Sequence, residues 1–453
     1  MLYFSICFFV EKLIERTEGL GKIQSFLNGV AREYRLNFYL FFYIKRMEVI
    51  DMNCSKDLAD KYYAQCVEIR HRLHQYPELS GQELETARYV SKILDEIGIE
   101  HKTRIGGNGI VGIIKGADPG KTVLLRADMD AIACDEETDL PYRSQNKGVS
   151  HSCGHDGHIA GLLLAAMILN ELKSEWCGNV KLMFQPAEET GTGARRMIDE
   201  GVLRNPVVDA AFACHLWGNI PEGKVAVKIG PIMASTDEFQ ITINVYGSHA
   251  AMPYLTVDPF AVMTQIVAQV QSIVSRRIDP LEPTVVSIGI VEGGTSYNRI
   301  PNKVVIKGTI RTLSNKTRQT IKDEIGDICK RLSCQEDTKY GKNYCLCTVN
   351  FIDDLDDGPT PPLVNDIAAA NIAQQAIVKT VGAKNMIDIP TSMGGEDFAY
   401  IAERVSSAYF FVGIAKDKDR PVVHHNSKFQ FDDEIIKTSS VCLAQIALEF
   451  LHI

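Results

Sequence analysis

Apolar and polar residues follow two different periods along this chain of 453 residues. Between residues 58 and 214, segments with helical apolar spacing alternate with short apolar runs that are typical of buried strands. The spacing predicts helices over 58–75, 82–97, 157–172 and 194–203, and strands over 123–127, 180–184 and 210–214. Such alternation predicts an α/β fold with a mostly parallel sheet, which binds ligands outside the carboxyl ends of its strands.

The pattern changes after residue 230. It predicts strands over 239–246, 285–291, 304–310 and 344–351, with helices over 259–277 and 316–332. That order, βαββαβ, is the ferredoxin-like unit. A helix over 363–381, a strand over 409–413 and a final helix over 433–451 then resume the α/β pattern. We therefore predict one domain formed by 56–232 and 353–453, interrupted by a second domain at 233–352.

Composition narrows the class of function. The formal net charge of −9 and the absence of a Lys/Arg-rich stripe argue against a nucleic-acid surface and favour a small-molecule substrate. The 12 cysteines are scattered without paired spacing, and a chain of this length does not need disulfides to fold. We expect a reducing compartment and a cytoplasmic protein.

Residues 1–55 form an N-terminal extension to which the sequence assigns no role. Its two apolar runs, over 2–10 and 36–44, are shorter than the roughly 20 residues of a membrane span. Lys12 and Arg16 follow the first run, whereas a secretory signal peptide carries its positive charge before the apolar run. We expect no stable membrane insertion.

Thiolate, imidazole and carboxylate side chains gather near the predicted strand ends. Cys153 and His155 are two residues apart, so they can share a metal ion only from a turn or an extended segment, and Gly154 permits that turn. His158 falls inside the following helix and is expected to be structural. The joint occurrence of these residue types predicts a metal site.

A pair of adjacent acids, Glu188 and Glu189, follows the strand at 180–184. Neighbouring side chains project differently, so one can bind a metal while the other takes a proton from an activated water, which predicts hydrolysis. His215 ends an apolar strand, and either His424 or His425 can supply a further ligand.

Seven motifs along residues 71–451 together resemble the M20 metallopeptidase clan, in the amidohydrolase branch of hippurate hydrolases, N-acyl-amino-acid deacylases and plant indole-acetyl-amino-acid hydrolases. They are HRLHQYPEL at 71–79, LRADMDA at 125–131, SCGHD at 152–156, QPAEE at 185–189, GSHAAMP at 247–253, GTIRT at 308–312 and GGEDF at 394–398. The resemblance implies a metallohydrolase domain interrupted by a ferredoxin-like lid domain used for dimerisation, and two divalent ions per subunit, Mn²⁺ or Zn²⁺, with Co²⁺ or Ni²⁺ also possible.

The resemblance also implies roles for single residues. Cys153 resembles the ligand that bridges the two metals. Four further ligands complete the site, and these are His155, Glu189, His215 and His425. Glu188 resembles the general base, and Asp130 resembles an acid that orients a ligand. His425 is preferred over His424 because the family places this ligand four residues before an aromatic residue, here Phe429, and before Asn or Ser, here Asn426.

Three residues of the second domain resemble substrate-binding groups. His249 resembles a residue that crosses a dimer and polarises the scissile carbonyl in the partner's site. Asn298 and Arg311 resemble groups that hold the substrate carboxylate, although a surface ion pair is an equal alternative for Arg311. Tyr254 stands where the family often has a second His, which leaves the acyl specificity open.

The sequence therefore predicts a homodimeric, metal-dependent amidohydrolase that cleaves N-acyl amino acids into a carboxylic acid and a free amino acid. One alternative is a dipeptidase or carboxypeptidase of the same clan. A second, from another class, is a catalytically inactive binding homologue, which the intact set of ligands and base disfavours.

Overall fold

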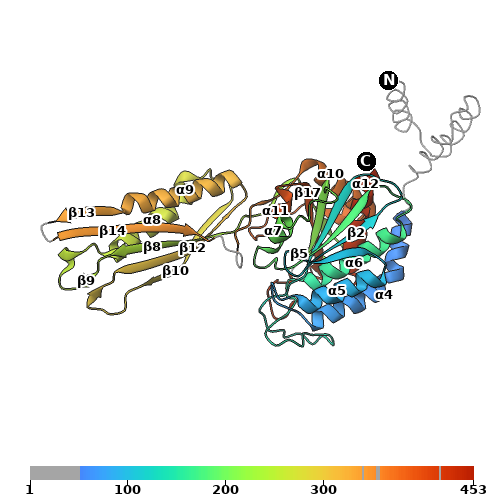
Figure 1. The fold of residues 1–453 in the computed structure, drawn as a ribbon, viewed down its shortest axis with the longest axis horizontal. Coiled ribbons are helices and arrows are strands. Elements are labelled where there is room, and N and C mark those ends of the chain that lie inside the picture. The colour runs from blue at the N-terminus through green and yellow to red at the C-terminus, as the bar shows by residue number, and fades with distance from the viewer. Residues whose placement is uncertain (1–51, 339–340, 353–357, 418–419, 453) are drawn as a thin grey trace, which may run out of the picture. The chain divides into compact units, whose positions relative to one another are not determined.

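The computed structural model describes residues 52–338, 341–352, 358–417 and 420–452. The predicted N-terminal extension therefore lies almost wholly outside the described residues, which begin with helix α4 at Met52. Two sheets organise the rest of the chain, one of eight strands and one of five (Figure 1).

The eight-stranded sheet has the order β1-β2-β4-β3-β5-β17-β6-β16. Its four central strands, β4, β3, β5 and β17, run parallel, and β2 and β6 flank them in the antiparallel sense. The strands are β1 (Glu100–Ile105), β2 (Gly109–Lys115), β3 (Thr122–Asp128), β4 (Asn179–Gln185), β5 (Ala210–Pro221), β6 (Val225–Ala226), β16 (Met386–Ile387) and β17 (Ser406–Ala415).

Helices cover both faces of this sheet, and every residue of β3 is buried as a result. α6 and α12 pack against each other and on β3, while α7 and α11 pack together beside β4 and β17. The helices are α4 (Met52–Gln75), α5 (Leu84–Glu96), α6 (His155–Glu171), α7 (Gly193–Asp199), α10 (Ile367–Val381), α11 (Ala399–Ala402) and α12 (Ile435–His452).

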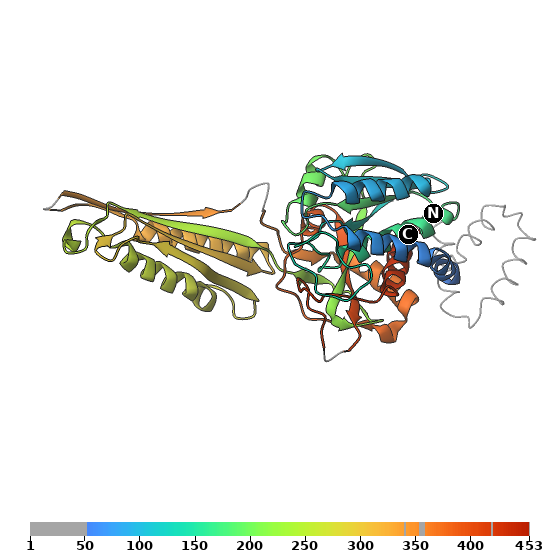
Figure 2. The ribbon, with the colours of Figure 1, turned by 90° about the horizontal axis from the view of Figure 1, so that it is seen from below.

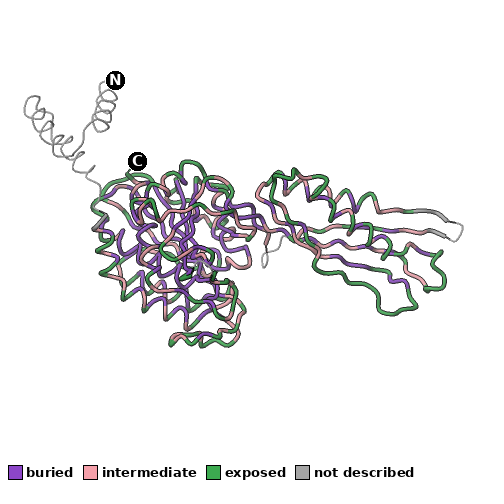
Figure 3. The backbone as a smooth tube through the Cα atoms, turned by 180° about the vertical axis from the view of Figure 1, so that it is seen from behind, coloured by how far each residue is buried: buried purple, intermediate pink, exposed green. Residues whose placement is uncertain are grey.

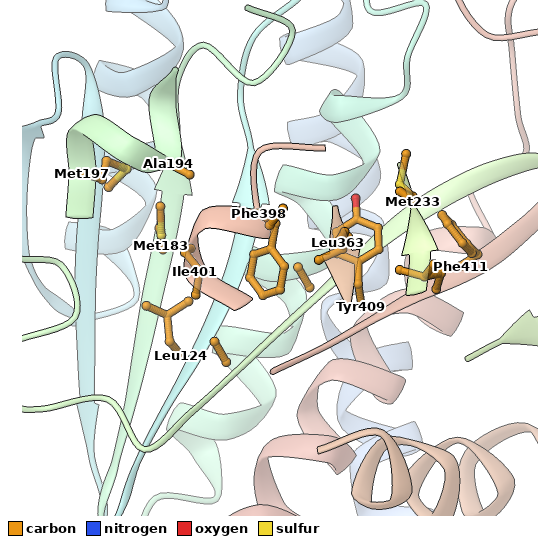
Figure 4. Close-up of a cluster of buried hydrophobic side chains, with 14 of the residues drawn as sticks. Leu124, Met183, Ala194, Met197, Met233, Leu363, Phe398, Ile401, Tyr409 and Phe411 are labelled. Atoms are coloured by element: carbon orange, nitrogen blue, oxygen red, sulfur yellow. The ribbon is translucent and has the colours of Figure 1, made fainter. Parts of the chain in front are cut away.

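Figure 4 shows part of the apolar cluster that includes Leu124 of β3, Met197 of α7, Ile401 of α11 and Phe411 of β17. Because side chains alternate along a strand, Val123 and Leu125 point to the opposite face. Figure 3 shows the buried segments concentrated along these strands and α6.

The five-stranded sheet is antiparallel and has the order β10-β12-β8-β14-β13. α8 and α9 pack together on one face of it (Figures 1 and 2). The element order is the predicted βαββαβ, with β13 added as an edge strand. The elements are β8 (Asp237–Val245), α8 (Pro259–Arg277), β10 (Thr284–Gly293), β12 (Lys303–Thr312), α9 (Asn315–Leu332), β13 (Cys334–Thr338) and β14 (Gly341–Phe351).

Short elements complete the described chain. Two small antiparallel pairs join β9 (Ser248–His249) to β11 (Arg299–Ile300), and β7 (Gly230–Met233) to β15 (Leu363–Asn365). Two 3-10 helices span Pro253–Leu255 and Ala383–Asn385.

Three predicted boundaries were wrong, and two strands were missed. The helix predicted to end at Leu203 ends at Asp199 as α7. β5 does not end at Cys214 but runs on to Pro221, because β17 pairs with it beyond the last residue that pairs with β3. The helix predicted from Leu363 begins at Ile367, since Leu363–Asn365 pairs as β15 and Asp366 caps the helix. β1 and β2 were not predicted, and the outer strand β1 is polar and largely exposed.

One helix among the described residues, α12, is long and apolar enough to cross a membrane by length and composition. Most of it is buried within the fold, where it packs against α6 and α10. Its apolar character therefore has an explanation in the core.

Candidate metal centre and active site

The predicted ligands gather at the carboxyl ends of the central strands. Asp130 follows β3, and Glu188 and Glu189 follow β4. His215 lies inside β5 rather than at its end. It nevertheless reaches the same level, because Arg126 of β3 pairs with Ala213 two residues earlier.

A tight turn presents Cys153 and His155 from the start of α6. Gly154 has a φ of 92° and serves as the N-cap of that helix, a left-handed conformation that suits glycine. Nδ1 of His155 donates to the backbone carbonyl of Asp130 at 2.9 Å. This bond fixes the ring and leaves Nε2 available as a ligand.

His215 is fixed in the same way from the opposite side. Its Nδ1 donates to the carbonyl of Leu216 at 2.7 Å, and its Nε2 lies 3.5 Å from Sγ of Cys153. His158, in contrast, has no nitrogen to spare. Its Nδ1 donates to Asp128 at 2.6 Å and its Nε2 accepts from the Leu216 amide, so it is structural, as the sequence predicts.

The loop after β4 separates the two glutamates. The Glu189 amide donates to Oδ2 of Asp130 at 2.9 Å. Oε1 of Glu189 lies 3.8 Å from Nε2 of His155 and 3.2 Å from Nε2 of His425. The loop closes tightly on itself, because a Cβ at Gly193 would lie 1.6 Å from the carbonyl oxygen of Pro186.

Both adjacent histidines reach the site, in different ways. Nε2 of His424 accepts from the Gly218 amide at 3.0 Å, and its Nδ1 is 3.9 Å from Sγ of Cys153. His425 is more exposed, and its ligand atom lies with those of Cys153 and Glu189. The geometry therefore accommodates His425 as the outer ligand.

Besides a group of His155, Glu188 and Glu189, the candidate ligands form two groups that share Cys153. One group contains Cys153, His155 and His215, and the other contains Cys153, Glu189 and His425. Within each group the ligand atoms all lie within 4.8 Å of one another. Nε2 of His155 and Oε1 of Glu189 are buried and make no hydrogen bond. Buried polar atoms need partners, so these residues fit metal ions of the kind that thiolate, imidazole and carboxylate bind.

The buried carboxylates around the candidate ligands favour binding of positive charge between them. Burial opposes charging of His155, but the carboxylates of Asp128 and Asp130 outweigh it and raise the pKa of His155 to about 10. Burial, together with the charges of Glu396 and Glu189, raises the pKa of Glu188 well above its usual range. A divalent cation would relieve both effects.

A buried network of charged residues lies behind the ligands. Its residues belong to the motifs at 125–131, 185–189 and 394–398, but the sequence predicts no role for them. Arg126, 1% exposed, donates to Asp128 at 2.7 Å, to Glu396 at 3.0 Å and to Asp397 at 3.1 Å. Asp397 also accepts from the Gln185 side chain at 2.7 Å. The one signal in the sequence was that a single arginine, Arg126, and the acids Glu396 and Asp397 occur in two of the motifs. That signal could have indicated an ion pair between the two motifs.

A cavity of about 550 Å³ opens over the ligands. Its wall includes Cys153, Glu188 and Glu189, and the apolar side chains of Trp217 and Met393. Glu238 and Arg311 of the five-stranded sheet also line it, as does Ile352, which follows β14. Arg311 is partly buried and makes no hydrogen bond or ion pair with any described residue.

Two predicted substrate groups are absent from that wall. His249 is exposed in β9, where its Nδ1 accepts from the Ala251 amide at 3.1 Å. Asn298 is also exposed, and its side-chain oxygen accepts from Ser296 at 2.6 Å. Neither residue lines the cavity of its own chain.

Known proteins resemble this chain in sequence and in fold. A sequence profile described as peptidase family M20/M25/M40 matches residues 124–449. N-acetyl-L-cysteine deacetylase of Bacillus subtilis (strain 168) is 37% identical, over 85% of this chain and 88% of that protein. Thermostable carboxypeptidase 1 of Saccharolobus solfataricus is 36% identical, over 85% of this chain and 95% of that protein. A similar crystal structure is that of the Bacillus subtilis YXEP protein, described as a dinuclear metal-binding peptidase of the M20 family. It is 31% identical in sequence, and the two structures match with a TM-score of 0.71 over 86% of this chain and 99% of that chain.

Proposed function

Because this chain belongs to peptidase family M20/M25/M40, we propose that it is a two-metal amidohydrolase that releases an amino acid from its N-acyl conjugate. It is a hydrolase that acts on amide bonds. The observation that carries the proposal is the pair Glu188 and Glu189. Both line the cavity, and Glu189 also belongs to a group of candidate ligands with Cys153.

The proposed metal centre would hold two divalent ions, with Cys153 belonging to both groups of ligands. His155 and His215 complete one group of ligands, and Glu189 and His425 complete the other, with Asp130 holding the Glu189 amide. Bound divalent ions supply Lewis-acid activation of a water and of the scissile carbonyl. Mn²⁺ or Zn²⁺ is proposed, since carboxylate and imidazole ligands suit both.

Glu188 performs the proton transfers in this proposal. As a carboxylate it accepts a proton from the attacking water, whose oxygen bonds to the carbonyl carbon, and it returns that proton to the amine nitrogen as the C–N bond breaks.

Arg311 is the proposed partner of the substrate carboxylate, together with Asn298. Arg311 lines the cavity from β12 and makes no hydrogen bond or ion pair with a described residue, while the carboxylates of Glu238 and Asp237 attract its charge. Its planar guanidinium can bind a carboxylate through two hydrogen bonds. This feature supports a substrate with a free amino-acid carboxylate.

A homodimer formed by the lid domain, residues 233–352, is proposed to supply His249 from the partner. β10 is an edge strand, and its Val285, Ile290 and Val291 are exposed. An unpaired apolar edge favours association with another strand. The exposed His249 would then act in the partner's cavity rather than in its own.

A carboxypeptidase or dipeptidase is the second candidate, favoured by the likeness to thermostable carboxypeptidase 1. A reducing, cytoplasmic location is also proposed, since every cysteine among the described residues is free.

A hydrolysis screen tests the proposed reaction. Purified protein supplied with Mn²⁺ or Zn²⁺ is given N-acetyl, N-benzoyl and indole-acyl amino acids, and dipeptides for comparison. We expect faster release of amino acids from the acyl conjugates than from dipeptides, and no release after removal of metal. Preference for dipeptides would favour the second candidate, and no hydrolysis of any substrate would contradict both.

Substitution of each glutamate by glutamine tests the division of roles. Glu188→Gln keeps the shape but removes the base, so kcat should fall by roughly 10²–10⁴-fold while two ions per subunit remain bound. Glu189→Gln should instead lose metal, as measured by elemental analysis of dialysed protein. The reverse pattern would show that the two neighbours have exchanged roles.

Mixed dimers test the action of His249 across the interface. His249→Ala and Glu188→Ala homodimers should both be inactive. A heterodimer of the two variants has one site with both residues intact, so about half of wild-type activity is expected if the sites act independently.

The matched control pairs His249→Ala with the double variant Glu188→Ala, His249→Ala, which restores no site. If the first mixture stays inactive although subunit exchange is demonstrated, His249 does not act in the partner's cavity.

A further inference from the structure

Glu83 contacts the loop that carries the two glutamates, although it lies 104 residues before that loop in sequence. Its side chain is fully buried. Oε1 accepts from the Ala187 amide at 2.9 Å and from the Gly81 amide at 2.7 Å, and Oε2 accepts from Asn108 at 3.3 Å. The Ala187 contact fixes the residue that immediately precedes Glu188.

Stabilisation of helix α5 does not explain this side chain. Glu83 occupies the N-cap position of α5 but makes no side-chain hydrogen bond to that helix. Glu78 does so instead, because its carboxylate accepts from the Glu85 amide at 3.2 Å and from the Thr86 amide at 2.8 Å. The buried carboxylate of Glu83 therefore bonds to the loop that contains Ala187 and not to the helix that it precedes.

The loop needs an external contact at this point. Ala187 has a φ of 53°, a left-handed conformation that is unfavourable for a residue with a Cβ. Ala187 is 2% exposed, so its amide requires an acceptor within the protein. Oε1 of Glu83 is that acceptor.

We propose that Glu83 is a positioning residue that aims the carboxylate of Glu188 by holding the backbone amide of Ala187, a residue in the left-handed conformation. The inference rests on the proposed function for the role of Glu188. Two acids then fix this loop through its backbone amides. Glu83 accepts from the amide of Ala187, which precedes the base, and Asp130 accepts from the amide of the ligand Glu189. Their substitutions should have separable effects.

Two substitutions of Glu83 separate its hydrogen bonding from its charge. Glu83→Ala removes the acceptor, so kcat should fall ~10- to 100-fold, with KM changed by less than about threefold and two ions still bound, because small misplacements of reacting groups have costs of this order. Glu83→Gln keeps an acceptor oxygen and should stay within about threefold of wild type. Burial and the charge of Asp130 raise the pKa of Glu83, which makes the neutral amide a closer mimic.

A second measurement follows the loop itself and needs no activity. Hydrogen exchange of the peptide that contains residues 185–190, followed by mass spectrometry on metal-loaded protein, should be faster in Glu83→Ala and unchanged in Glu83→Gln. Glu85→Ala is the matched control. Its side chain is 66% exposed and pairs only with Arg88 among the described residues, so neither kcat nor exchange should change.

Three results would overturn the proposal, and these are unchanged exchange in Glu83→Ala, loss of metal in proportion to activity, and a Glu83→Gln enzyme as slow as Glu83→Ala. If wild-type protein hydrolyses no acyl amino acid, the proposed function fails, and the exchange measurement still decides whether Glu83 holds the loop.

Discussion

Negative charge buried at the end of a parallel sheet must be matched by positive charge, and this constraint governs the centre of the molecule. Arg126 supplies the match on the inner side, where it contacts Asp128, Glu396 and Asp397. On the outer side Oε1 of Glu189 lies 3.8 Å from Nε2 of His155 and 3.2 Å from Nε2 of His425, and neither imidazole carries a permanent charge like the guanidinium of Arg126. The surplus of negative charge on Glu188 and Glu189 is what bound divalent ions would neutralise.

The need to stabilise buried negative charge also explains why several of these carboxylates accept hydrogen bonds from backbone amides. Asp130 accepts from the Glu189 amide, Asp397 accepts from the Ala194 amide, and Glu83 accepts from the Ala187 amide. Each bond satisfies a buried carboxylate and at the same time fixes one part of the loop between β4 and α7. The position of Glu188 is therefore determined by groups from several strands and loops, and a rigid loop of this kind suits catalysis by a positioned base.

Much of the fold followed from periodicity. α8 begins and ends at the predicted residues, because Asp258 and Pro259 mark its start and its apolar face is regular. The length of β5 could not be predicted, since pairing with the distant strand β17 determines it. The outer strand β1 lacks the apolar alternation that reveals a half-buried strand.

The candidate site was predictable where a chemical type marks the residue. The motifs brought Cys153, His155 and Glu189 together in the prediction, and the structure places their ligand atoms in overlapping groups. Glu83 could not be found in this way. It is one polar residue at the start of a helix, and only the fold shows that it bonds to the Ala187 amide rather than to that helix.

The most direct measurement of the metal centre is anomalous X-ray diffraction from crystals of active enzyme, recorded at the absorption edge of the metal that supports turnover. Two peaks are predicted, each within about 2.5 Å of Sγ of Cys153, one beside His155 and His215 and the other beside Glu189 and His425. A single peak in active enzyme, or peaks that do not share Cys153, would contradict the proposed bridged two-metal centre.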